Sequence, residues 1–141
     1  MTGLYVVVAA AVLAIAFGIY RQVTDGRVRG AGSRSPRLEA ADLGTGLGTD
    51  ATFVQFSSAV CAPCRATHRV LSKISAEDEG VVHVEVDAEA RLDLVERYGI
   101  TRTPTVLLLD GTGIVRHRIV GAARAPEVRE ALEEVAGRRA A

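Results

Sequence analysis

The stretch TFVQFSSAVCAPCR, residues 52–65, decides the fold of this chain of 141 residues. Its first part, 52–56, is mostly β-branched or aromatic and predicts a buried strand. After a short loop, apolar residues at helical spacing predict a helix over 64–76. The two cysteines of the chain, Cys61 and Cys64, therefore stand where a strand passes through a loop into the N-terminus of a helix.

This placement gives Cys61 and Cys64 the surroundings of reactive thiols. Two cysteines three residues apart are too few and too close to staple a fold. The unpaired N–H groups and the dipole at a helix N-terminus favour a thiolate at Cys61. Pro63 fits the first helical turn, because its missing N–H has no helical acceptor to lose. We expect Cys61 to attack a substrate disulfide and Cys64 to resolve the mixed disulfide.

The region 38–141 predicts an α/β domain, because apolar periodicity and turn residues alternate along it. A short helix or strand over 38–43 precedes a Gly-rich loop. The further expected elements are a strand at 81–86, a helix at 91–98, strands at 105–109 and 114–120, and a helix from Pro126 to about 136. This order predicts a mixed sheet covered by helices on both faces.

Residues 1–21 predict a transmembrane anchor. From residue 2 to residue 20 there is no charged side chain, and nineteen helical residues span about the 30 Å of a bilayer core. Tyr5 and Tyr20 lie near the two ends, where aromatic residues favour the membrane interface. The alternatives are a buried core helix, which usually has a polar face, and a cleaved signal peptide, which usually has a Lys or Arg before the apolar run.

Residues 22–37 predict a flexible linker rich in Arg, Gly and Ser. The arginines that follow the apolar run are opposed by a single acid, Asp25; they are Arg21, Arg27, Arg29, Arg34 and Arg37. The positive-inside rule then places the domain on the cytoplasmic face, although a single short span can insert either way. The arginines either contact anionic lipid headgroups or form a merely soluble basic linker.

With these elements in place, residues 52–65 resemble the active-site segment of the thioredoxin family. A second segment, YGITRTPT at 98–105, resembles the cis-proline loop of that family. The resemblance makes Pro104 the cis proline and Thr103 the residue whose backbone pairs with bound substrate. A cis X-Pro bond is uncommon and marks a functional turn.

Residues 120–122 resemble the glycine loop beside the active site of thioredoxins, which places Gly121 at the edge of the substrate groove. The three motifs keep the family's order, and the resemblance covers about residues 50–137. It implies a thioredoxin-like fold and thiol–disulfide oxidoreductase activity, with no cofactor and no metal.

The chain departs from the family pattern at several positions. Family thioredoxins usually carry Trp-Cys-Gly-Pro-Cys, whereas this chain has Val60 before the first cysteine and Ala62 after it. Gln55 matches the family's buried aspartate, and His83 matches the lysine partner of that aspartate. Because the acid is thought to help move the proton of the second cysteine and Gln55 cannot titrate, His83 is the candidate substitute. The alternative is that His83 is only a packed strand residue.

The resemblance favours a membrane-anchored reductase of protein disulfides, because proline in the third place of the motif is typical of reductants in the family. Its expected partners are proteins with disulfides and an upstream electron donor, either a reductase or a small thiol. The alternatives are an extracytoplasmic disulfide oxidant, a binding module without redox turnover, and a metal site at Cys61, Cys64 and His68, for which a second Cys pair is missing. The chain has seventeen acidic and seventeen basic side chains, and this balance gives no electrostatic reason to expect nucleic-acid binding.

Overall fold

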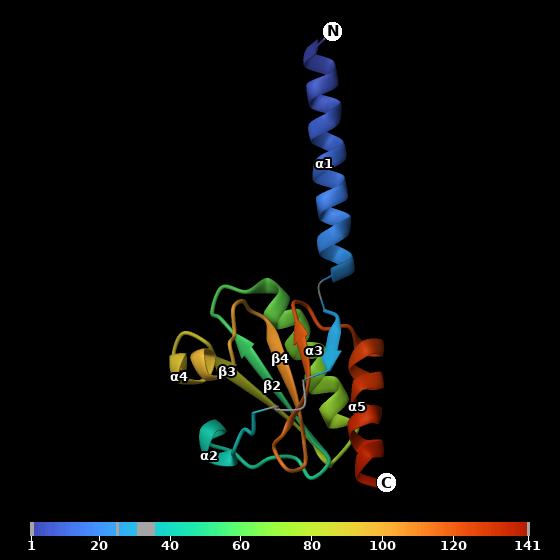
Figure 1. Ribbon diagram of the computed structural model, residues 1–141. Coiled ribbons are helices and arrows are strands. Elements are labelled where there is room, and N and C mark those ends of the chain that lie inside the picture. Colours follow the sequence, from blue (N-terminus) through green and yellow to red (C-terminus); the bar gives the residue numbers. More distant parts are fainter. Residues whose placement is uncertain (1, 25, 31–35, 141) are drawn as a thin grey trace.

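The computed structural model describes residues 2–24, 26–30 and 36–140, and Figure 1 shows a long helix that leaves one end of an α/β domain. The elements are α1 (Thr2–Thr24), β1 (Val28–Gly30), α2 (Ala40–Leu43), β2 (Ala51–Ser57), α3 (Ala62–Ala76), β3 (Val81–Asp87), α4 (Leu92–Arg97), β4 (Thr105–Asp110), β5 (Val115–Val120) and α5 (Ala125–Ala140).

The described strands form one mixed sheet in the order β1-β5-β4-β2-β3. Strand β2 pairs parallel with β3 and antiparallel with β4, so it lies inside the sheet, and every one of its residues is buried. Its side chains alternate between two cores, as the period of a strand requires. Phe53 packs with residues of α3 and α5, whereas Val54 and Phe56 pack with Leu94 of α4. The predicted mixed sheet with helices on both faces is confirmed.

The strands and helices expected from residue 51 onward are present, with ends that shift by a few residues. The main shift concerns α3, which begins at Ala62 instead of residue 64, so that Cys61 caps it. The segment 38–43, expected to be a short helix or strand, contains the four-residue helix α2.

The structure contains regular elements within residues 22–37, where the sequence predicts a flexible linker. Helix α1 continues to Thr24, and Val28–Gly30 form strand β1, paired antiparallel with β5. The sequence does not reveal this strand, because three residues show no apolar period and the strand exists through backbone pairing with a distant partner. Residues 25 and 31–35 of the expected linker lie outside the described residues.

Helix α1 is the one described helix long and apolar enough to cross a membrane, over Gly3–Thr24, and this span is not buried in the domain. A signal sequence near the N-terminus can satisfy the same criteria of length and composition.

A close backbone contact joins the end of α1 to the domain. Gly26 donates its N–H to the carbonyl of Val120 at 2.8 Å, and the Arg124 guanidinium donates to the carbonyl of Gln22. Gly26 has φ +81°, and a Cβ there would overlap the Ala122 carbonyl oxygen. Glycine is therefore required at this position.

We predict that Gly26→Ala detaches β1 from β5, because the methyl group clashes with backbone and the positive φ costs about 1–3 kcal/mol for other residues. Hydrogen exchange of the full chain in detergent should show faster exchange in peptides covering β1 and β5. Gly30→Ala is the matched control, since a Cβ there meets no atom within 4 Å. Equal exchange in both variants would contradict this account of the junction.

Candidate active site

The two cysteines meet at the start of α3. Cys61 is the N-cap residue, and its Sγ accepts a hydrogen bond from the backbone N–H of Cys64 at 3.2 Å. The two sulfur atoms form a disulfide, with Cys61 8 % exposed and Cys64 2 % exposed. The N–H donor and the helix dipole both stabilise negative charge on the Cys61 sulfur. Ala62 and Pro63, the residues between the cysteines, form the exposed first turn of the helix.

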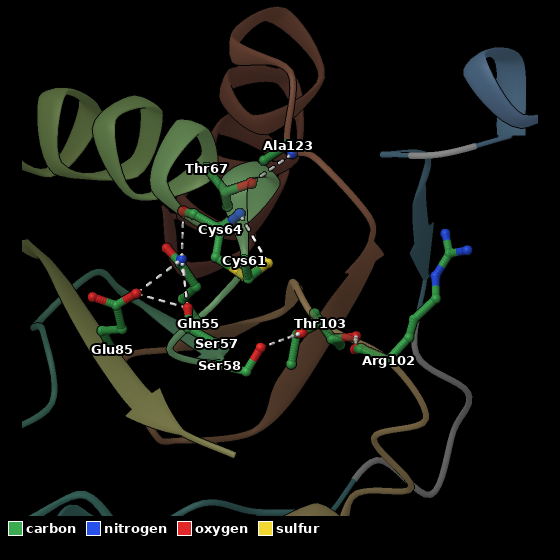
Figure 2. The surroundings of a disulfide bond; sticks show 11 residues. Gln55, Ser57, Ser58, Cys61, Cys64, Thr67, Glu85, Arg102, Thr103 and Ala123 are labelled. Carbon is green, nitrogen blue, oxygen red and sulfur yellow. Dashed lines mark hydrogen bonds between the residues drawn. A yellow bond between two sulfur atoms is a disulfide. The ribbon is translucent and has the colours of Figure 1, made fainter. Parts of the chain in front are cut away.

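The proline loop lies against the cysteine loop. The Thr103–Pro104 peptide bond is cis, as expected from the sequence. The hydroxyl oxygens of Ser58 and Thr103 are 3.2 Å apart, which ties the segment before Cys61 to the segment before Pro104 (Figure 2).

The glycine loop closes the same end of the sheet. Gly121 has φ +92° and donates its N–H to the carbonyl of Pro104 at 2.8 Å. Two residues later, Ala123 donates its N–H to the buried hydroxyl of Thr67 on α3 at 3.1 Å. The structure thus brings together the three segments that the sequence singled out around Cys61, Pro104 and Gly121.

A fully buried amide, Gln55, lies beneath the first turn of α3. Its Nε2 donates to the carbonyl oxygen of Cys64 at 2.9 Å. The same nitrogen lies 2.8 Å from the hydroxyl oxygen of Ser57 and 3.2 Å from Oε1 of Glu85 (Figure 2). Its Oε1 is 3.1 Å from Nε2 of His83. Gln55 therefore connects β2, α3 and β3 behind the cysteines.

His83 contacts this network from β3. One ring nitrogen is bonded to Gln55, and the other lies 3.1 Å from the hydroxyl of Ser72. Burial and the nearby charge of His68, whose ring centroid is 5.0 Å away, lower the pKa of His83 to about 4. At neutral pH the imidazole is therefore uncharged and a weak base.

Glu85 was not recognised as a site residue from the sequence, and His68 was considered there only as a possible metal ligand. Glu85 accepts a hydrogen bond from the Ser57 hydroxyl at 2.7 Å, and its other oxygen lies 3.0 Å from Nδ1 of His68. An open cavity of about 480 Å³ is lined by Glu85 and His68 together with Cys61 and Cys64. The available signal was a carboxylate inside a valine-rich strand, two residues after His83 and so on the same face of the strand.

Among the described residues, no three His, Cys, Asp or Glu side chains gather closely enough to hold a metal ion. The cysteines and His68 line one cavity with Glu85, and the polar contact of His68 there is the carboxylate.

Comparison with known proteins points to one family. A family model described as a thioredoxin-like domain matches residues 45–136. The chain is 31 % identical to thioredoxin of Echinococcus granulosus over 85 residues, which are 60 % of this chain and 75 % of that protein. It is 29 % identical to thioredoxin of Mycoplasma pneumoniae over 69 residues, 49 % of this chain and 67 % of that one.

Solved structures agree on the fold. A mutant thioredoxin from Halobacterium salinarum superposes with a TM-score of 0.56 and 20 % identity, over 62 % of this chain and 76 % of that chain. Chloroplastic thioredoxin z gives a TM-score of 0.57 and 24 % identity, over 63 % and 80 % of the two chains.

The lowered pKa of His83 predicts a loss of stability in acid. The folded state resists protonation of His83 down to about pH 4, whereas the unfolded chain binds that proton near pH 6.5. Acidification from pH 6.5 to pH 4 should therefore lower the free energy of unfolding, by about 2 kcal/mol for this group after allowance for solvent screening.

The measurement is denaturant unfolding of the full chain in detergent, followed by circular dichroism at pH 7.5 and pH 4.5. His83→Asn should lose less stability between the two pH values than the unsubstituted chain. The same loss in both proteins would show that His83 does not carry this proton linkage.

Proposed function

The chain belongs to the thioredoxin-like family, and on that premise we propose that it is a membrane-anchored oxidoreductase that reduces protein disulfides through Cys61 and Cys64. One observation carries the proposal. The Cys61 sulfur accepts an N–H at the N-terminus of α3, beside the cis Thr103–Pro104 bond. This arrangement stabilises a thiolate next to a loop that binds substrate in the family.

The reaction we propose begins with the reduced pair. The Cys61 thiolate attacks a substrate disulfide, the substrate S–S bond breaks, and one substrate thiolate leaves while Cys61 forms a mixed disulfide. Cys64 then attacks the Cys61 sulfur, which releases the second substrate thiolate and leaves the Cys61–Cys64 disulfide. Two electrons pass to the substrate. Cys61 is the attacking residue because it is the more exposed of the two.

The second step requires that Cys64 lose its proton. Gln55 cannot accept it, and His83, with a pKa of about 4, is a weak base. We therefore assign the acceptor role to the Glu85 carboxylate, which shares the active-site cavity with Cys64 and is linked to Gln55 and Ser57. His83, the candidate from the sequence, would instead hold the Gln55 amide in place.

The substrate would lie as an extended segment across the two loops. Val60 is 96 % exposed beside Cys61, and the hydroxyl of Thr103 is held by Ser58 on the facing loop. We propose that the backbone of Thr103 pairs with the substrate, with Gly121 at the groove edge and Pro104 beneath it.

Membrane anchoring is supported by α1, whose apolar span is not covered by the domain, and by the arginines that follow it. The positive-inside rule favours the cytoplasmic face for the domain. A cytoplasmic reductase or a small thiol would then regenerate the Cys61–Cys64 dithiol, and the proposed reaction needs no cofactor.

We predict that Cys64→Ser accumulates substrates as stable mixed disulfides on Cys61, because the resolving thiol is gone. The test is acid-trapping of cells, solubilisation of the membrane fraction, and non-reducing electrophoresis followed by mass spectrometry. Cys61→Ser is the control and should trap no substrates.

If Cys64→Ser traps nothing, the reductase proposal fails and a binding role remains. Treating intact cells with a membrane-impermeant phosphine and then a membrane-impermeant maleimide also reports the side of the membrane for the unsubstituted chain. Unlabelled cysteines agree with a cytoplasmic domain, and labelled cysteines place the domain outside.

We further predict that Glu85→Gln slows resolution of the mixed disulfide by about 100-fold near pH 7, the usual size of a general-base effect. The Gln side chain can still accept the bonds from Ser57 and Gln55, so the fold should remain intact. The rate is measured by acid quench and mass spectrometry after mixing reduced full chain with a disulfide-bonded peptide.

The pH profile separates proton transfer from a structural effect. The loss in resolution rate caused by Glu85→Gln should become smaller toward pH 9, because an ordinary thiol with a pKa near 8.5 ionises there without a general base. Glu89→Gln, an exposed residue in the turn after β3, is the matched control. A deficit that is the same at every pH would remove Glu85 from the proton route.

A further inference from the structure

Helix α3 carries a strip of basic side chains that begins beside the cysteines. Arg65, Arg69 and Lys73 follow one another at intervals of four residues, so they share one side of the helix, and all three are exposed. At 1.5 Å per residue, this basic strip extends about 12 Å along the helix. The 15 residues of α3 include no Asp or Glu, although acidic and basic side chains balance over the whole chain.

The charge of the basic strip is not compensated within the described part of the chain. Across residues 2–24, 26–30 and 36–140, no hydrogen bond or ion pair involves the side chains of Arg65, Arg69 or Lys73. The acid that follows at the same spacing on the helix, Glu77, pairs with Arg129 of α5 at 2.6 Å. The basic strip is therefore open to a negatively charged partner.

The basic strip also opposes the local stability of α3. Like charges four residues apart on a helix repel each other, and both Arg65–Arg69 and Arg69–Lys73 are such pairs. Arg65 lies in the first turn, where the helix dipole disfavours a cation. A pattern that breaks local rules without an internal compensation is typical of a functional surface.

The basic strip begins in the cavity that contains the reacting sulfur atoms. Arg65 and Arg69 line the open cavity of about 480 Å³ together with the two cysteines. Figure 2 shows Glu85, which lines this cavity, and Thr103, which belongs to the proposed substrate groove, on different sides of the cysteines. A substrate attached to Cys61 would therefore meet the groove on one side and the basic strip on the other.

We propose that the basic strip docks an acidic segment of the substrate protein, so that the preferred substrates carry Asp or Glu near the cysteine that is reduced. An extended segment advances about 3.3 Å per residue, so about four residues would lie along the strip. Complementary charge raises the rate of encounter and fixes the register of the two partners. A peptide is favoured over a lipid surface because the strip begins beside the sulfur atoms that a substrate must reach.

The test compares disulfide-linked peptide dimers that differ only in the residues flanking the cysteine, which are all Glu, all Gln or all Lys. Each dimer is mixed with the reduced full chain in a non-ionic detergent. Acid quench and mass spectrometry then give the second-order rate constant for oxidation of the chain. Each rate is divided by the rate of the same dimer with dithiothreitol, which removes differences in the intrinsic reactivity of the peptides.

At low salt we expect the Glu peptide to react about fivefold faster than the Gln peptide, as two exposed ion pairs of ordinary strength would produce. Arg65→Gln/Arg69→Gln should bring this ratio close to one, and Arg65→Glu/Arg69→Glu should prefer the Lys peptide. The ratio cancels any change in the reactivity of Cys61 itself. Arg97→Gln/Arg129→Gln is the matched control, because it removes the same charge from α4 and α5 outside the cavity and should keep the ratio.

Three outcomes would overturn the proposal. Equal rates of the unsubstituted chain with the Glu and Gln peptides would show that acidic residues are not recognised. Equal loss of the ratio in the two Gln double variants would show only an effect of net charge. Loss of the preference in phosphatidylglycerol nanodiscs, with the preference kept in phosphatidylcholine nanodiscs, would assign the basic strip to an anionic membrane surface.

The proposal rests on the proposed function, because it names the substrate class of the same site, but the two can fail separately. A chain that reduces all three peptides at equal rates keeps the redox function and loses only the acidic preference. A chain that reduces none of the peptides, although dithiothreitol reduces them, loses the redox function itself.

Discussion

The hydrogen bond from the buried Gln55 amide to the carbonyl of Cys64 is the interaction on which the site depends. Gln55 lies in β2, inside the sheet, and its bond fixes the first turn of α3 above that strand. Removing the amide would take from this carbonyl the bond that ties α3 to β2, at a cost of about 0.5–1.5 kcal/mol. The geometry of Cys61 depends on the same turn, because its sulfur accepts the N–H of Cys64.

Because Gln55 is a neutral amide, the carboxylate of the site lies on another residue. A carboxylate in the fully buried place of Gln55 would carry a large desolvation cost unless paired. Here the carboxylate is Glu85 on β3, the edge strand, where its side chain is 41 % exposed and hydrated. Glu85 stays connected to the core through Ser57 and Gln55, so the site keeps an acid at a smaller cost of burial.

Local patterns were sufficient to predict much of this structure. The strand before Cys61, the helix after Cys64 and the proline loop are encoded in short segments whose periodicity or motif can be read directly. Two features depend on contacts between distant residues and were missed. Strand β1 exists only through its pairing with β5, and Glu85 joins the site only because the parallel register sets it opposite Gln55. Neither register can be derived from three or seven residues alone.

The pairing of β1 with β5 has a mechanical consequence for the proposed function. Because β1 belongs to the sheet and Gly26 is bonded to Val120, helix α1 reaches the domain without a long free tether on this side. The end of β5 also leads into Gly121, which is bonded to Pro104. The segment after α1, the glycine loop and the proline loop are therefore linked by consecutive backbone hydrogen bonds. If the chain is anchored as we propose, the substrates that fit best carry their disulfides close to the membrane surface.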